Sequence, residues 1–214
     1  MTPGIQTALR LTEAGAIVLE SATGELCELD SVAGDGDHGL AMGTAARAIR
    51  RRLAEDPPAD ARTLTELLAA EFGAVGGSMG ALLSVAFEAL GDKTAACDAP
   101  LSAQHVADYL ATVREALSEF GGAKVGDKTI IDAAAGAQEA AAATADRGAG
   151  PAEALTAAAA GANAGADSTA NMIAQVGRAS RLGERSRGSV DAGARSFALV
   201  LTAIAHAYAT GGRA

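Results

Sequence analysis

The fold is decided by a stretch in the middle of the chain that reads VADYLATVREALSEFGGAKVGDKT, residues 106–129. Its first half carries large apolar side chains at spacings of four, three, four and three residues: Val106, Leu110, Val113, Leu117 and Phe120. This spacing predicts an amphipathic helix, because residues three and four apart share one helix face. Its second half carries three glycines, which predict a loop. The rest of the chain repeats this alternation of helix and loop.

Helices are expected throughout the chain. They cover residues 3–22, 39–53, 62–73, 78–91, 102–120, 127–146, 151–173 and 191–210. No stretch sustains the two-residue alternation of a strand, so no sheet is expected. The alanine-rich segment 133–145 has strong helix propensity and predicts a closely packed helix rather than a disordered linker. The expected fold class is therefore all-α, with a single domain over residues 1–214.

The links between these helices are of two kinds that alternate. Glycine-rich links follow the first, third, fifth and seventh expected helices, whereas the other links carry Pro57-Pro58, Pro100 and Pro151. Short links make consecutive helices antiparallel. All four glycine loops should then meet at one end of an eight-helix antiparallel up-down barrel or bundle. The helix N-termini gathered there carry partial positive charge, which suits a phosphate group.

Composition and charge narrow the classes of function. The net charge of −9 argues against a nucleic-acid or anionic-membrane role. No signal peptide or transmembrane run is visible, so the expected location is cytoplasmic. Cys27 and Cys97 have neither metal-ligand spacing nor a disulfide pattern, as in a reducing compartment. Aromatic residues make up only 3%, so the core must consist of small side chains between close helices.

The first glycine loop, DSVAGDGDHG at residues 30–39, contains three carboxylates: Asp30, Asp35 and Asp37. Carboxylates so close repel one another unless a cation lies among them, and Mg²⁺ prefers oxygen ligands. Metal and glycine-exposed N–H groups together favour a nucleotide site. The alternative is a solvated acidic helix cap. A calcium EF-hand fits poorly, because the twelfth position from Asp35 is Ala46 instead of Glu.

The second and third loops, GGSMG at 76–80 and GGAKVGDKT at 121–129, leave similar alternatives open. Ser78 is a natural N-cap, and the glycines beside it could cradle phosphate oxygens or allow close helix packing. Lys124 and Lys128 could balance phosphate charge, while Asp127 could simply cap the next helix. In the first loop, His38 could hydrogen-bond a phosphate or brace the loop.

The fourth loop, residues 177–193, is the longest and contains Arg178, Arg181, Arg185 and Arg187. Long connections inside compact domains are usually functional or disordered, so this loop is expected to be a lid whose arginines grip phosphate. A solvated basic loop is the alternative. Walker A, protein-kinase and Rossmann signatures are absent. With no tryptophan, adenine would lie on aliphatic or thioether surface, for which Met42 and Met79 are candidate walls.

Taken together, GDGDHG at 34–39, GGSMG at 76–80, GGAKVGDKT at 121–129 and GRASRLGERSRGSVDAG at 177–193 resemble the nucleotide-binding L subunit (DhaL) of dihydroxyacetone kinases. The four motifs occur in the family's order and span nearly the whole chain. The resemblance implies an eight-helix antiparallel barrel with the nucleotide at one end, in agreement with the loop alternation.

The resemblance also implies residue roles. Asp30, Asp35 and Asp37 would hold two Mg²⁺ ions that bridge the phosphates of ADP or ATP, and Arg178 would join them in catalysis. Nucleotide contacts are implied for His38, Gly39, Leu40, Ala41, Ser78, Met79, Gly121, Ile130, Arg178, Asp191, Ala192 and Gly193. The chain departs from its relatives at Ala41, Ile130, Arg181 and Ala192, where Asn, Met, an aromatic residue and Pro are frequent. The metal ligands are intact.

The implied function is that of a phosphotransferase subunit in glycerol metabolism. It would transfer phosphate, with Mg²⁺, from the bound nucleotide to a ketose (dihydroxyacetone, or glycerone) held on a separate K subunit. Some relatives use ATP directly, and others keep ADP that a phosphotransferase-system M subunit recharges. A homodimer, a four-carbon ketose or fatty-acid acceptor, and a non-catalytic nucleotide-sensing module are left open. Fatty-acid relatives tend to carry DGDTG, so His38 favours a ketose.

Overall fold

The computed structural model describes residues 2–94 and 100–211, and within them the chain is all-helical. The α-helices are α1 (Pro3–Ser21), α2 (Thr23–Ala33), α3 (His38–Glu55), α4 (Ala61–Ala74), α5 (Gly77–Thr94), α6 (Ala103–Gly121), α7 (Ile130–Asp146), α8 (Pro151–Ser168) and α9 (Ala192–Gly211). Two 3₁₀ segments, η1 (Thr169–Asn171) and η2 (Ala179–Ser186), precede α9. The all-α class is confirmed, with no strand in the described part. Cys97 lies outside the described residues.

Helix α2 lies where the sequence predicts part of a link, so the structure differs from the expectation here. Only Ala22 separates α2 from α1, and the backbone N–H of Ala22 still donates to the carbonyl of Val18 as in a helix. Thr23 turns its hydroxyl back to the carbonyl of Glu20 at 2.9 Å, a contact that bends helices. Helix α3 packs along both α1 and α2, so the bent pair runs like one long helix. The alternation of loop ends is therefore preserved.

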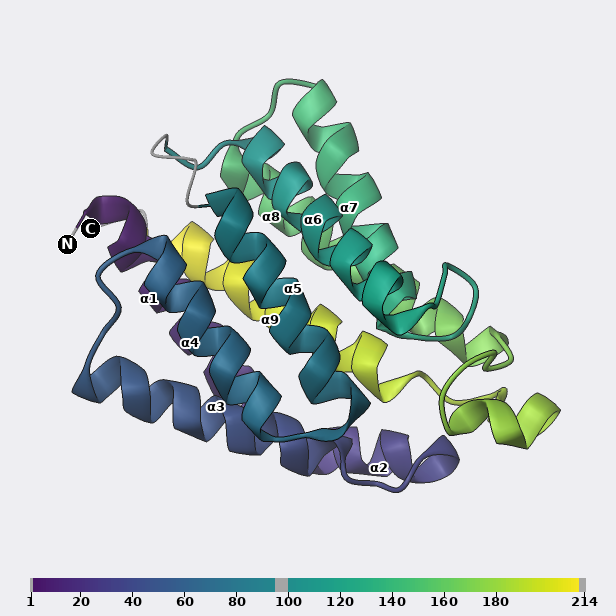
Figure 1. Ribbon diagram of the computed structural model, residues 1–214. Coiled ribbons are helices and arrows are strands. Elements are labelled where there is room, and N and C mark those ends of the chain that lie inside the picture. The colour runs from purple at the N-terminus through teal and green to yellow at the C-terminus, as the bar shows by residue number, and fades with distance from the viewer. Residues whose placement is uncertain (1, 95–99, 212–214) are drawn as a thin grey trace.

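The helices form an antiparallel array with two distinct ends (Figure 1). At the lower right of this view lie the α2–α3, α4–α5 and α6–α7 links, the 172–191 segment and the start of α9. At the opposite end lie the start of α1, the end of α9, and the links 56–60 and 147–150. This is the separation that the glycine and proline links predicted. We call the first set of segments the loop end.

Helices α7 and α8 pack more closely than any other pair. A Cβ atom on Gly136 would overlap the carbonyl oxygen of Gly161, and one on Gly165 would lie 2.9 Å from the Cα of Ala133. Around them lies a core cluster built largely of buried alanines. The alanine-rich segment is thus a closely packed helix, as expected. No helix of the described residues is both long enough and apolar enough to span a bilayer.

Several helix boundaries differ from those expected. Helix α7 begins at Ile130 because Thr129 is its N-cap, in a capping box with Asp132. Asp127 does not cap the helix; its carboxylate accepts the N–H of Lys124 at 2.9 Å within the loop. Ser78 is not an N-cap either, since it is the second residue of α5.

Candidate nucleotide and metal site

The three aspartates of the first loop come together around the short α2–α3 link. Asp30 is on the last turn of α2, and Asp35 and Asp37 lie in the link itself. One carboxylate oxygen from each lies within 4.8 Å of the others, with Asp30 half-buried and the other two exposed. A Cβ on Gly34 would lie 2.8 Å from the Asp30 carboxyl carbon, so a side chain at this position would displace the Asp30 carboxylate. Three hard oxygen donors facing one shared space fit a magnesium ion.

His38 is buried and braces the loop from behind. Its Nε2 lies 3.0 Å from Oγ of Ser196 on α9. Because the Ser196 hydroxyl donates its proton to the carbonyl of Gly193 at 2.9 Å, His38 is the donor in this pair. Burial lowers the pKa of His38, against a smaller opposing effect of the Asp30 carboxylate. The backbone N–H of His38 donates to the Asp30 carboxylate at 3.3 Å, so the residue orients this carboxylate as well.

The residues that follow His38 have separate surroundings. Gly39 is buried against α2, where a Cβ would overlap the carbonyl oxygen of Thr23 and lie 2.8 Å from the backbone nitrogen of Cys27. Leu40 and Ala41 instead line a groove of about 350 Å³ between α3 and α4, with Asp37 on its border. In this structure Gly39 therefore serves helix packing, and Leu40 and Ala41 face the groove.

Met42 and Met79 differ in their availability to a ligand. Met42 is only 1% exposed in the core, so its prediction as an adenine wall is wrong. Met79 is half-buried, and its Cε would lie 2.7 Å from a Cβ on Gly193. The Cβ of Ile130 lies 3.6 Å from the same point. The starts of α5, α7 and α9 thus meet at Gly193.

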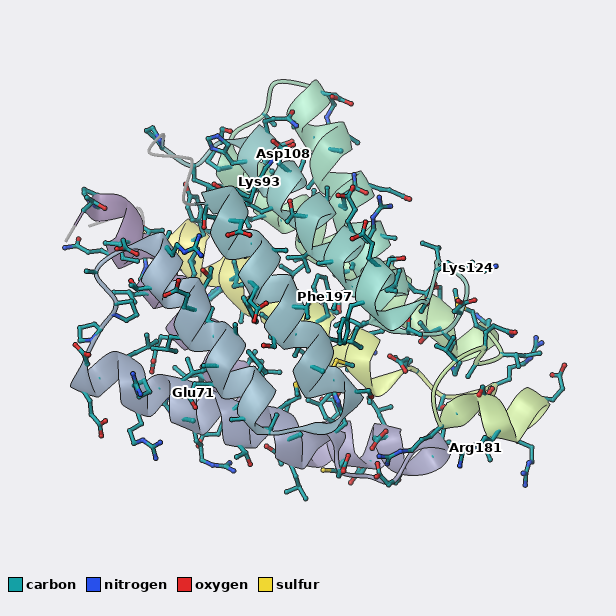
Figure 2. The ribbon with its side chains drawn as sticks, in the orientation of Figure 1. Glu71, Lys93, Asp108, Lys124, Arg181 and Phe197 are labelled. Carbon is teal, nitrogen blue, oxygen red and sulfur yellow. The ribbon has the colours of Figure 1, made fainter. Side chains whose placement is uncertain are left out.

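The outer parts of the second and third loops are open. Gly76 and Gly77 have positive φ angles of 71° and 70°, and nothing would obstruct a group placed beside them. Ser78 and Gly121 are exposed. Lys124 is exposed too, and Figure 2 places it at the loop end with Arg181, far from Lys93 and Asp108.

Lys128 is not available to balance phosphate charge. Its side chain is buried, and Nζ donates to the carbonyls of Thr169 at 2.6 Å and Ser189 at 2.5 Å. Its neighbour Asp191 accepts the N–H of Ala194 at 2.8 Å, and burial raises the pKa of the Asp191 carboxyl to about 6. Of the two candidate lysines, only Lys124 can reach a ligand without rearrangement.

The arginines of the fourth loop reach back to the first. Arg178 forms an ion pair with Asp35. Arg181, Arg185 and Arg187 are exposed, and Arg187 contacts Glu184 at 3.4 Å. Contacts through Arg178, His38, Lys128 and Gly193 therefore connect all four loops around the aspartates, as the loop alternation predicted.

Two residues that support this site, Ser196 and Asp132, are not among the residues that the sequence predicts. Ser196 lies inside α9, where serine has no distinctive pattern. Asp132 accepts the N–H groups of Gly126 at 2.6 Å and Thr129 at 2.8 Å, so it holds the third loop. The spacing from Thr129 to Asp132 is that of a capping box, and it could have located the start of α7.

Most of the chain matches a known domain family. The DAK2 domain profile matches residues 32–206. The chain belongs to the DAK2 domain family. This DAK2 domain is 33% identical, over 91% of its own length and 90% of the relative's, to the "PEP-dependent dihydroxyacetone kinase 2, ADP-binding subunit DhaL" of Listeria innocua. The resemblance to DhaL is therefore confirmed.

Other relatives are longer than this DAK2 domain. It is 38% identical over 200 residues to an L-erythrulose kinase of Pectobacterium atrosepticum, and the matched region covers 92% of this chain but only 34% of the relative. The dihydroxyacetone kinase of C. freundii in complex with AMP-PNP and Mg²⁺ superposes with a TM-score of 0.72 at 30% identity, over 92% of this chain and 33% of that one. The chain thus spans about a third of the length of the first curated relatives that it matches.

Proposed function

We propose that this DAK2 domain binds Mg-ADP or Mg-ATP at the loop end and is the nucleotide-binding part of a ketose kinase. The observation that carries the proposal is the convergence of Asp30, Asp35 and Asp37 with three further loops from distant parts of the sequence. Support comes from relatives described as kinases and as an ADP-binding subunit, and from the C. freundii complex with AMP-PNP and Mg²⁺.

The three aspartates would hold the metal, two ions in our proposal. When bound, Mg²⁺ neutralises charge on the phosphates during transfer. The chain's own groups do the rest. The His38 N–H orients Asp30, and Arg178 exchanges Asp35 for a phosphate oxygen, where its planar fork can bind two oxygens.

The remaining nucleotide contacts divide by surface. The open backbone around Ser78 would approach phosphate or sugar oxygens, and Met79 and Gly121 would offer surface to the base. Ile130 is buried, so it would act indirectly, by packing against Met79. Asp191, Ala192 and Gly193 would bound the site at the start of α9. Leu40 and Ala41 would contribute from the α3 side, while Gly39 would act indirectly by setting the spacing of α2 and α3.

The acceptor would arrive on a K-type subunit that docks on the loop end. Five large hydrophobic side chains are strongly exposed among the described residues, and four belong to segments at this end: Val32, Leu40, Phe120 and Val125. Exposed apolar groups gathered beside a reaction site favour protein contact. An M subunit of a phosphotransferase system would be a further partner if ADP stays bound.

The acceptor is proposed to be a small ketose. Dihydroxyacetone is favoured by the DhaL relative, and the four-carbon erythrulose by the erythrulose kinases. Turnover of the domain with a K-type partner, measured on dihydroxyacetone and on both enantiomers of erythrulose, discriminates between them. Binding of nucleotide without turnover on any ketose would favour the nucleotide-sensing alternative.

The test of the nucleotide site is calorimetry and thermal melting with Mg-ADP and Mg-ATP. Saturation at a hundred times Kd should add about 3 kcal/mol of stability, which raises Tm by roughly 6–12 °C for a chain of this size. Asp35→Ala and Asp37→Ala should lose this shift while circular dichroism stays helical. Asp146→Ala, at the opposite end on the last turn of α7, is the matched control. Normal Mg-ADP affinity in both loop variants would rule the proposal out.

A further inference from the structure

Lys128 has an unusual backbone and an unusual environment. Its φ angle is +63°, the only positive value on a non-glycine residue in the described part of the chain. Its side chain is only 4% exposed. A left-handed backbone is costly for a side chain with a Cβ, and a buried ammonium is costly without partners. Both costs fall on one residue, so its side chain must make a compensating contribution.

That contribution is a connection between two distant segments. Nζ donates to the carbonyl of Thr169, directly after α8, and to the carbonyl of Ser189, shortly before α9. Two further hydrogen bonds join the same two segments of the chain. The N–H of Gly188 donates to the carbonyl of Ala170 at 2.8 Å, and the N–H of Asp191 donates to the hydroxyl of Thr169 at 2.9 Å. The ammonium therefore lies where both ends of residues 170–188 are held together. We call this segment the arginine loop.

The other side of the arginine loop reaches the metal site. Arg178 forms its ion pair with Asp35 across the gap to the first loop. Within the arginine loop, Ser186 accepts the N–H of Ala174 at 3.0 Å and donates to the carbonyl of Gly183 at 2.6 Å. These contacts make the loop a braced unit whose orientation depends on where its two ends are fixed.

We propose that Lys128 is a positioning residue that acts through Arg178. Its ammonium fixes the base of the arginine loop and thereby places Arg178 beside the aspartates. The negative charges of Asp191 and Asp132 near the ammonium offset part of its burial cost. The effect on nucleotide rests on the proposed function, but the anchoring of the loop does not.

The experiment uses Lys128→Gly and Lys128→Met, with Lys93→Met as the control, because Lys93 is an exposed lysine on the last turn of α5, far from the loop end (Figure 2). Glycine suits φ of +63°, so Lys128→Gly relieves the backbone while it removes the whole side chain, whereas Lys128→Met keeps most of the aliphatic chain and removes the ammonium. Tryptic cleavage after the four arginines of the arginine loop (Arg178, Arg181, Arg185 and Arg187), measured without nucleotide, should become about tenfold faster in both Lys128 variants. Both variants lose the hydrogen bonds of the ammonium that hold the base of this loop in place. Mg-ADP should bind about tenfold more weakly.

A double-mutant cycle separates positioning from a general loss of structure. Arg178→Gln should weaken Mg-ADP binding, and adding Lys128→Met should cost little more, because both changes remove the same contact. Additive losses, or a Lys128→Gly variant with wild-type cleavage and affinity, would overturn the proposal. If wild type itself binds no Mg-ADP, the proposed function fails, and the cleavage rates alone still decide whether Lys128 anchors the loop.

Discussion

Gly39→Ala tests whether the glycine after His38 serves helix packing. The added Cβ would overlap the carbonyl oxygen of Thr23 and lie 2.8 Å from both the nitrogen and the Sγ of Cys27. Overpacking costs about 1–3 kcal/mol, and the upper value applies here because the obstacle is helix backbone that cannot rotate away. Alanine's better helix propensity returns up to about 1 kcal/mol. The net loss is then about 2 kcal/mol, a fall in Tm of roughly 4–8 °C.

The matched control for Gly39→Ala is Gly24→Ala in α2. A Cβ on Gly24 meets no atom within 4 Å, so only the gain in helix propensity remains and Tm should hold or rise. Thermal melting by circular dichroism without nucleotide gives both values, independently of any assignment of function. If Gly39→Ala melts at or above the Gly24→Ala variant, the close approach of α2 and α3 is refuted, and Gly39 returns to the candidate ligand contacts.

Two more predictions concern the partner surface and pH. Phe120→Ser should lower turnover with a K-type partner roughly tenfold, with Mg-ADP affinity unchanged, since a docked aromatic residue is worth over 1 kcal/mol. The control is Ile17→Ser, which should change neither quantity, because Ile17 is in α1 and the whole of α2 follows it before the loop end. Equal losses of turnover in the two variants would contradict docking at Phe120. For Asp191, a pKa raised to about 6 means that the folded chain holds this proton more tightly than the unfolded one. Its stabilising contribution is present below about pH 4 and is lost as pH rises through 6, so Asp191→Asn should match wild type in stability near pH 4 and exceed it by up to about 3 kcal/mol at pH 7.5; equal melting profiles of the two proteins from pH 4 to 7.5 would contradict the raised pKa.

The placement of the site could be predicted because it depends on chain topology. Glycine and proline links alternate along the sequence, and antiparallel helices turn that alternation into two ends in space. Asp35 and Asp37 could be located for the same reason, since they lie in a link. The contacts that hold the site could not be predicted, because they join residues far apart in sequence. His38 and Ser196 are separated by 158 positions, and no local pattern marks either as the other's partner.

The prediction of local structure was wrong where tertiary packing outweighs the local sequence pattern. Helix α2 has one buried residue, Leu26, so it lacks the apolar stripe by which a helix is recognised. It forms because α1 continues into it and because α3 covers it, and Gly39 is what allows α3 so close. The prediction that Lys128 contacts phosphate or solvent was wrong because of a tertiary contact. A lysine in a glycine loop is usually solvated, and only tertiary structure can bury its ammonium between two carbonyls.

The glycines of the loop motifs therefore do two kinds of work, and the distinction affects how the motif is interpreted. Gly34, Gly39 and Gly193 each face an atom that a Cβ would crowd, so they set distances between protein groups. Gly76 and Gly77 face open space at positive φ, so they leave backbone accessible to a ligand. The crowded glycines fix the distances among Asp30, His38 and the starts of α3 and α9 before any nucleotide binds. Alanine at Gly39, which faces helix backbone, should therefore show its damage in the melting temperature alone. Alanine at Gly76 or Gly77 would carry the cost of a left-handed backbone and should lower nucleotide affinity as well.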